Sequence, residues 1–183
     1  MMLEGIAGPE ENVGYLSGAF NIANLILKLS AAAMWVLLPF ISQAHRSDRH
    51  PPYLILKKCI KLISIICITL SVGIIFCGQW ALAWFGQDYL LAYQPLVLLT
   101  ITNSLLALSD CFVFYLIFHN KTQHVMISLG VILSISLGIS TYLIPQFNML
   151  GATLASLITS ILSISYYFFL VRHTESSQRL NKI

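Results

Sequence analysis

The sequence predicts an all-α, polytopic membrane protein with five transmembrane helices. Of its 183 residues, 57% are hydrophobic and only 9% are charged, and the mean hydropathy is +0.81. A soluble domain carries roughly 25% charged residues, so lipid must be the solvent for most of this chain's surface. The apolar residues also fall into runs of about 20, the length at which a helix crosses a hydrocarbon core of roughly 30 Å. These runs lack the alternation of barrel strands, which would be about half as long.

Five such runs follow one another along the chain. The first begins after an amino-terminal tail whose only charges are glutamates, and it ends before a cluster of histidine and arginine. The second begins after Lys61, the third follows Pro95, and Pro145 separates the last two. Proline lacks an amide donor and does little harm at a helix boundary. The predicted spans are approximately residues 13–41, 62–84, 96–118, 125–144 and 149–171, followed by a tail of residues 172–183.

The lysines and arginines predict the orientation, because positively charged loops resist translocation. The loops at residues 85–93 and 145–148 contain no basic residue. We therefore expect an amino terminus outside and a cytoplasmic carboxyl terminus. No basic segment with a cleavage site precedes the first span, so a removable signal peptide is not expected. Nine of the ten basic residues lie in the loops on the other side: Arg46, Arg49, Lys57, Lys58, Lys61, Lys121, Arg172, Arg179 and Lys182.

The first span carries polar residues along one side. A lysine at the centre of a membrane helix costs about 2.5 to 3.5 kcal/mol on insertion scales, yet Lys28 lies near the middle of this span. At about 100° per residue, Lys28 belongs to a stripe that is about 80° wide, and we do not expect such a stripe to face lipid. The stripe consists of Ser17, Asn21, Asn24, Lys28, Ala31 and Trp35.

Two interpretations of this stripe remain open. In the first, the stripe forms hydrogen bonds to neighbouring helices, each worth about 1 kcal/mol, and Asp110 neutralises Lys28. In the second, the stripe lines a water-filled cavity in which Lys28 attracts an anionic substrate, because a charge in a low-dielectric wall is poorly screened. The second interpretation makes Ser17, Asn21, Asn24, Lys28 and Trp35 candidate substrate-binding residues.

The third span carries the second charge at membrane depth. Asp110 lies in its cytoplasmic half, on a face that also contains Thr100, Asn103, Ala107 and Phe114. An intramembrane carboxylate is a candidate for binding a coupling ion. We therefore treat Asp110 and Asn103 as candidate ion-coupling residues.

The fifth span carries a stripe of hydroxyl groups. We expect these groups to pack against other helices, because the small residues Gly151, Ala152 and Ala155 beside them allow close helix approach. The stripe consists of Thr153, Ser156, Ser160, Ser163 and Tyr167.

The sequence does not predict an enzyme, a cofactor, a metal site or binding to nucleic acid. It has no glycine loop for phosphate, no metal-ligand spacing and no nucleophile with a placed base. The basic loop is explained by topology and by attraction to anionic membrane lipids. The four cysteines are expected to act as small buried hydrophobic residues: Cys59, Cys67, Cys77 and Cys111.

Four short segments beside the loops occur in a distinctive order. They are residues 13–23 (VGYLSGAFNIA), 39–42 (PFIS), 85–89 (FGQDY) and 144–152 (IPQFNMLGA). In this order and spacing they resemble the carboxyl-terminal half of polysaccharide or O-antigen flippases of the Wzx type, in the MATE-like superfamily. The resemblance covers nearly the whole chain, residues 1–183, and implies most of one six-helix lobe in a transporter of two lobes.

The resemblance also implies a function. Such a transporter moves a lipid-linked oligosaccharide, carried on a polyprenyl pyrophosphate, across the bacterial cytoplasmic membrane by alternating access. The seventh helix and the first lobe would then lie outside this chain, and its partners would be an amino-terminal lobe or other membrane proteins of polysaccharide assembly. Two alternatives are a multidrug or cation antiporter of the same superfamily, in which Asp110 carries the coupling ion, and an inactive membrane remnant or scaffold.

Overall fold

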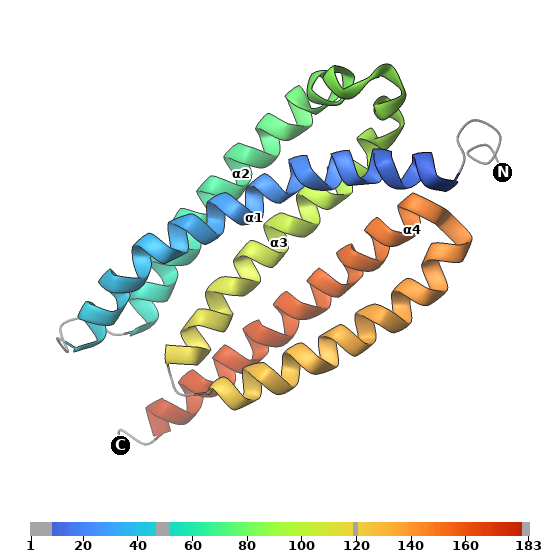
Figure 1. Ribbon diagram of the computed structural model, residues 1–183. Helices are drawn as coiled ribbons and strands as arrows, with labels where there is room; N and C mark the ends of the chain where they lie inside the picture. Colours follow the sequence, from blue (N-terminus) through green and yellow to red (C-terminus); the bar gives the residue numbers. More distant parts are fainter. Residues whose placement is uncertain (1–8, 47–51, 119–120, 181–183) are drawn as a thin grey trace.

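The computed structural model describes residues 9–46, 52–118 and 121–180, which form long helices and one short 3-10 helix (Figure 1). No strand occurs in these ranges, so the predicted all-α class is confirmed. The elements are α1 (Pro9–Arg46), α2 (Pro52–Phe85), η1 (Gln87–Ala92), α3 (Tyr93–Phe118) and α4 (Thr122–Leu180).

The helices provide five segments that are long and apolar enough to cross a membrane. The α4 ribbon reverses its direction about halfway along, so α4 contributes two of them (Figure 1). The predicted multi-pass membrane protein with five spans is therefore confirmed. The segments are Gly14–Val36, Lys57–Trp84, Gln87–Ile117, Thr122–Phe147 and Leu150–Arg172.

The reversal within α4 differs from the helix boundary that the sequence predicts there. Helical conformation continues from Thr122 through Pro145 to Leu180, and it includes most of the expected tail. At the reversal the backbone comes very close to itself, because a Cβ on Gly151 would lie 2.7 Å from the carbonyl carbon of Leu143. A residue without a Cβ is therefore needed at position 151 for the two halves of α4 to meet.

The central helix of the bundle is α3. It contacts α1, α2 and α4, whereas α2 and α4 do not contact each other within the described ranges. Hydroxyl pairs join α3 to its neighbours, with 3.0 Å between the Oγ atoms of Ser71 and Ser104 and 3.0 Å between those of Ser109 and Ser163. Because lipid supplies no hydrophobic driving force between helices, such polar contacts and close packing hold the bundle together.

Two clusters of buried side chains fill the bundle. One lies toward the end that contains η1 and is formed by Ala19, Ala23, Leu82, Ala92, Leu96 and Leu99. The other occupies the rest of the bundle and brings in α4; it is formed by Ile26, Met34, Ile63, Cys67, Ala107, Cys111, Phe112, Tyr115, Leu116, Val125, Tyr167 and Val171.

The outer faces of α2 and of the first half of α4 are apolar. On α2, Phe76 is 79% exposed and Trp84 is 94% exposed. On α4, Met126 is 69% exposed. In the most apolar 18-residue stretch of Thr122–Phe147, only 6% of the residues are buried within the bundle. So large an apolar surface is unfavourable in water but is favourable in contact with lipid. Trp80 and Trp84 lie near the η1 end of α2, where tryptophan is typical of a membrane interface.

The turn between α2 and α3 is held against α1. Gly86 has φ of 141°, a conformation that residues with a side chain rarely adopt, and it allows the chain to leave α2 and enter η1. The ring of Tyr89 then packs edge-on against Tyr15, with 4.9 Å between the ring centroids. A Cβ on Gly18 would lie only 3.1 Å from Cε1 of Tyr89, so a larger residue there would push the ring away.

Candidate functional site

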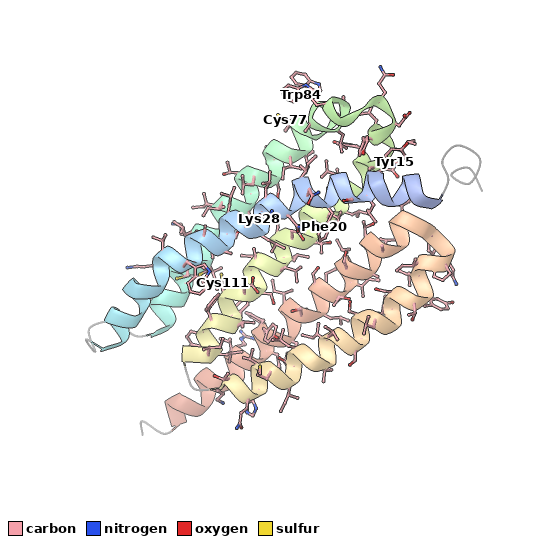
Figure 2. All side chains as sticks on the ribbon, viewed as in Figure 1. Tyr15, Phe20, Lys28, Cys77, Trp84 and Cys111 are labelled. Atoms are coloured by element: carbon pink, nitrogen blue, oxygen red, sulfur yellow. The ribbon has the colours of Figure 1, made fainter. Side chains whose placement is uncertain are left out.

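The polar stripe of α1 lies on the outside of the bundle. Lys28 lies near the middle of the helix (Figure 2), and its side chain is exposed, as are those of Ser17 and Asn21. Trp35, at the other end of the stripe, is 68% exposed. The residues of α1 that are buried in the bundle lie on the opposite side of the helix: Ala19, Ala23, Ile26, Ser30 and Met34.

Asn24 is the member of the stripe that the structure joins to another helix. Nδ2 of Asn103 on α3 donates a hydrogen bond to Oδ1 of Asn24, with 3.2 Å between the two atoms. Asn103 is only 3% exposed, and Asn24 is half-buried. The interpretation of the stripe as a hydrogen-bonding surface between helices of this chain therefore holds for Asn24, whereas Ser17, Asn21 and Lys28 face outward.

The predicted face of α3 divides into a buried part and an exposed part. Thr100 and Ala107 are buried, and Oγ1 of Thr100 donates to the carbonyl oxygen of Leu96 in its own helix at 2.8 Å. Asp110 is exposed. The structure thus separates the two candidate ion-coupling residues, because Asn103 bonds to α1 whereas Asp110 points outward.

Lys28 and Asp110 lie on the same side of the paired helices α1 and α3. The side chain of Ser30, which points about 160° away from Lys28 around α1, contacts Sγ of Cys67 on α2 at 3.6 Å. On α3, Ser104 faces α2 and points about 120° away from Asp110. Both charges therefore lie on the side of the α1 and α3 pair that is opposite α2.

The two charges do not neutralise each other. Within the part of the chain that the structure describes, no ion pair joins Lys28 to Asp110. The first interpretation, in which Asp110 neutralises Lys28 inside this chain, is therefore wrong. We call the outward-facing residues Ser17, Asn21, Lys28 and Asp110 the α1–α3 polar face.

The two charges of this face also lie at similar depths. The helices α1 and α3 run in the same direction (Figure 1), and the hydrogen bond between Asn24 and Asn103 gives a common reference point. Lys28 is one helical turn beyond Asn24, about 6 Å, and Asp110 is two turns beyond Asn103, about 10.5 Å. Their depths therefore differ by about 4.5 Å.

A polar face at this depth is unfavourable if lipid covers it. Each charge costs about 2.5 to 3.5 kcal/mol on insertion scales, and the amide of Asn21 adds to that cost. The lysine stem can extend toward an interface, but Asn21 has a short side chain and remains within the membrane. Water or another polypeptide is therefore expected to cover the α1–α3 polar face.

In the hydroxyl stripe of the second half of α4, four of the five residues are buried and Ser156 is half-buried, which confirms that the stripe packs within the bundle. Besides the contact between Ser163 and Ser109, Oγ of Ser128 donates a hydrogen bond of 3.0 Å to the hydroxyl oxygen of Tyr167. Thr153 and Ser160 are also buried. The stripe thus joins the two halves of α4 to each other and to α3.

The cysteines follow the prediction at three of four positions. Cys59, Cys67 and Cys111 are buried, whereas Cys77 is exposed on the outer face of α2. Among the described residues, no group of three histidine, cysteine or acidic side chains is placed to hold a metal ion.

Sequence reasoning did not find several contacts that the structure contains. These are the hydroxyl pairs from Ser71 to Ser104 and from Ser109 to Ser163, and the packing of Tyr89 over Gly18. Serines occur in every span, and only the packing of the helices selects which of them meet. The packing of Tyr89 had one signal in the sequence. Gly18 lies one helical turn from Tyr15, and a glycine beside an aromatic residue leaves room for a second ring.

Apart from Lys28, the exposed basic residues of the described ranges lie toward one end of the bundle. Lys57, Lys58 and Lys61 lie in the first three turns of α2. Arg172 lies in the last part of α4, with its guanidinium carbon 5.5 Å from the ring centroid of Phe168. These segments lie together at the end opposite η1 (Figure 1). The described segments that carry these four basic residues are thus at the same end of the molecule.

Comparisons with protein-family models, with curated proteins and with solved structures find no match to this chain.

Proposed function

We propose that this chain is part of a transporter that moves a lipid-linked oligosaccharide across the bacterial cytoplasmic membrane by alternating access. The observation that carries the proposal is the exposure of Lys28 at membrane depth, within a row of amide and hydroxyl groups on the surface of the bundle. A protein that needed these groups only for packing would bury them, as it buries Ser160 and Ser163 on α4.

The length of the stripe supports a path across the membrane. From Ser17 to Trp35 it extends along about 27 Å of helix, close to the roughly 30 Å thickness of the hydrocarbon core. Hydroxyl, amide, ammonium and indole groups succeed one another along this distance. A sugar chain can therefore exchange hydrogen bonds from one group to the next while it moves.

Each polar or aromatic residue of the stripe has a role in this proposal. The ammonium of Lys28 attracts the pyrophosphate, because a charge in a low-dielectric wall is weakly screened. Ser17, Asn21 and the Nδ2 amide of Asn24, which is not used in the bond from Asn103, bond to sugar hydroxyls. The exposed indole of Trp35 offers a flat apolar surface and one N–H donor to a sugar ring.

The orientation in this proposal follows from the charges. The end with Lys57, Lys58, Lys61 and Arg172 is cytoplasmic, and the η1 end faces outward. The amino terminus is then outside and the carboxyl terminus inside the cell. The opposite wall of the substrate path comes from a partner, which the resemblance identifies as an amino-terminal lobe.

The test is complementation of a flippase-deficient bacterium, in which this chain is expressed with and without an amino-terminal half of a flippase. We expect Lys28→Ala to reduce surface polysaccharide by about tenfold or more, the effect of losing one charge-assisted contact. Lys28→Arg retains the charge and should retain most of the transport. The matched control is Lys61→Ala, which removes an exposed lysine outside the stripe. If Lys28→Ala and Lys61→Ala transport equally well, the proposed role of Lys28 is wrong.

A second candidate function is supported by one observation, the exposure of Asp110 without an ion-pair partner among the described residues. A multidrug or cation antiporter would use this carboxylate to bind the coupling ion. Uptake of a cationic dye that depends on a proton or sodium gradient and is abolished by Asp110→Asn would favour this candidate. If dye uptake by the wild-type chain and by the Asp110→Asn variant is independent of either gradient, this candidate is excluded.

A further inference from the structure

We propose that the α1–α3 polar face binds a second copy of this chain, with Lys28 of each copy against Asp110 of the other. Both side chains are exposed at membrane depth, they have opposite charges, and they do not pair within one chain. The face is therefore complementary in charge to itself. This inference does not rest on the proposed function. It places a second copy where that proposal places an amino-terminal lobe, and it pairs Lys28 with a carboxylate in place of a pyrophosphate, so the association experiments below test it separately from transport.

A two-fold axis along the membrane normal produces this pairing. Because α1 and α3 are neighbours that run in the same direction, such an axis places α1 of one copy opposite α3 of the other, and the same contact occurs twice. The axis leaves the depth of every residue unchanged. Lys28 and Asp110 differ in depth by about 4.5 Å, which the flexible four-carbon stem of lysine can cover.

The surroundings of Lys28 permit a close approach. Ala31 and Ala32, which follow it on α1, are exposed and small, and small residues allow membrane helices to come together. Within the 183 residues, the segments outside the described ranges are at most eight residues long. They are too short to supply another spanning helix that would cover the face.

The first experiment uses complementary charge variants of the whole chain in vesicles of phosphatidylethanolamine and phosphatidylglycerol. Copies that carry donor or acceptor fluorophores report association by energy transfer. We expect wild-type copies to associate. Lys28→Asp gives each copy two carboxylates on the face, and Asp110→Lys gives each copy two ammonium groups, so each variant alone should associate at least about tenfold more weakly.

The decisive sample mixes the two variants. If the ion pairs form between copies, the Lys28→Asp copy and the Asp110→Lys copy restore both pairs, and association returns to near the wild-type level. Pairs within one chain would not be restored by mixing. Lys61→Asp, which changes the same residue type away from the face, is the control and should associate like wild type.

A second experiment, disulfide cross-linking between copies, does not depend on the folding of the charge-reversed variants. In a Cys77→Ser background, copies with Lys28→Cys and copies with Asp110→Cys are mixed and oxidised in vesicles. We expect a covalent dimer from this mixture and none when Ile68→Cys, on the outer face of α2, replaces Lys28→Cys. Monomeric wild-type chain, or equal cross-linking by both mixtures, overturns the inference and leaves the face to a different polypeptide.

Discussion

Asn103 donates a hydrogen bond to Asn24 across 3.2 Å, and this contact fixes the register between α1 and α3. This hydrogen bond also sets the relative depth of Lys28 and Asp110, because Lys28 follows Asn24 on α1 and Asp110 follows Asn103 on α3. Asparagine side chains are seldom placed in a membrane helix without a partner, and here each asparagine is the partner of the other.

Replacement of Asn103 should weaken the packing of α1 on α3. We expect Asn103→Leu to lower the free energy of unfolding by about 1 kcal/mol, the scale of a hydrogen bond between membrane helices. The loss is measured by unfolding in mixed detergent micelles with increasing dodecyl sulfate. Asn21→Leu removes the same residue type from the exposed stripe and should change stability little. Equal loss in both variants would contradict the assigned contact.

Replacement of Gly151 should disturb the reversal of α4. A Cβ there would lie 2.7 Å from the carbonyl carbon of Leu143 and 3.1 Å from Cα of Ile144, both of them backbone atoms that cannot move aside easily. We expect Gly151→Ala to destabilise the chain by about 1 to 3 kcal/mol, the usual cost of overpacking. The same unfolding titration measures this loss.

The matched control for Gly151 is Gly138, which lies in the same helix. A Cβ on Gly138 meets no atom within 4 Å. Gly138→Ala should therefore leave stability unchanged or raise it by about 0.5 to 1 kcal/mol through helix propensity. A stable Gly151→Ala variant would show that the two halves of α4 approach less closely than the structure indicates.

The exposed tryptophan at the end of α2 should report the membrane boundary. In a Trp35→Phe, Trp80→Phe chain, Trp84 is the remaining tryptophan of three, and its side chain is 94% exposed. We expect lipids brominated near the headgroups to quench its fluorescence more strongly than lipids brominated near the methyl ends. The opposite order would place the end of α2 in the middle of the bilayer.

The orientation of the chain can be tested from either side of the membrane. In a Cys77→Ser background, Asp88→Cys introduces an exposed thiol at the η1 end, and Lys121→Cys introduces a thiol at the basic end. An impermeant maleimide should label the first in intact spheroplasts and the second only after lysis. Buried Cys59, Cys67 and Cys111 should remain unlabelled in the native protein. Labelling in the reverse order would invert the orientation.

The number of spans was predictable because it depends on length and hydropathy alone. A run of about 20 apolar residues crosses the bilayer whatever its neighbours are. The packing role of Ser160 and Ser163 was also predictable, because small residues beside a hydroxyl stripe indicate a close helix contact.

The arrangement of the polar side chains was not predictable. A membrane helix is apolar on most sides, so its sequence does not show which side faces a neighbour. The stripe containing Asn24 and Lys28 reads as one surface, yet the structure pairs Asn24 with Asn103 and turns Lys28 outward. Pro145 likewise predicted a boundary, but the helical conformation continues through it, and the two halves of α4 approach each other closely at Gly151 and Leu143.

The separation of 79 residues between Asn24 and Asn103 has a consequence for the synthesis of the protein. At about 5 to 20 residues per second, a ribosome completes Asn103 about 4 to 16 s after Asn24. During that interval Asn24 has no partner on α3, because Asn103 has not been synthesised. The hydrogen bond that fixes the register between α1 and α3 can therefore form only after the third span is made, which places this contact late in the assembly of the bundle.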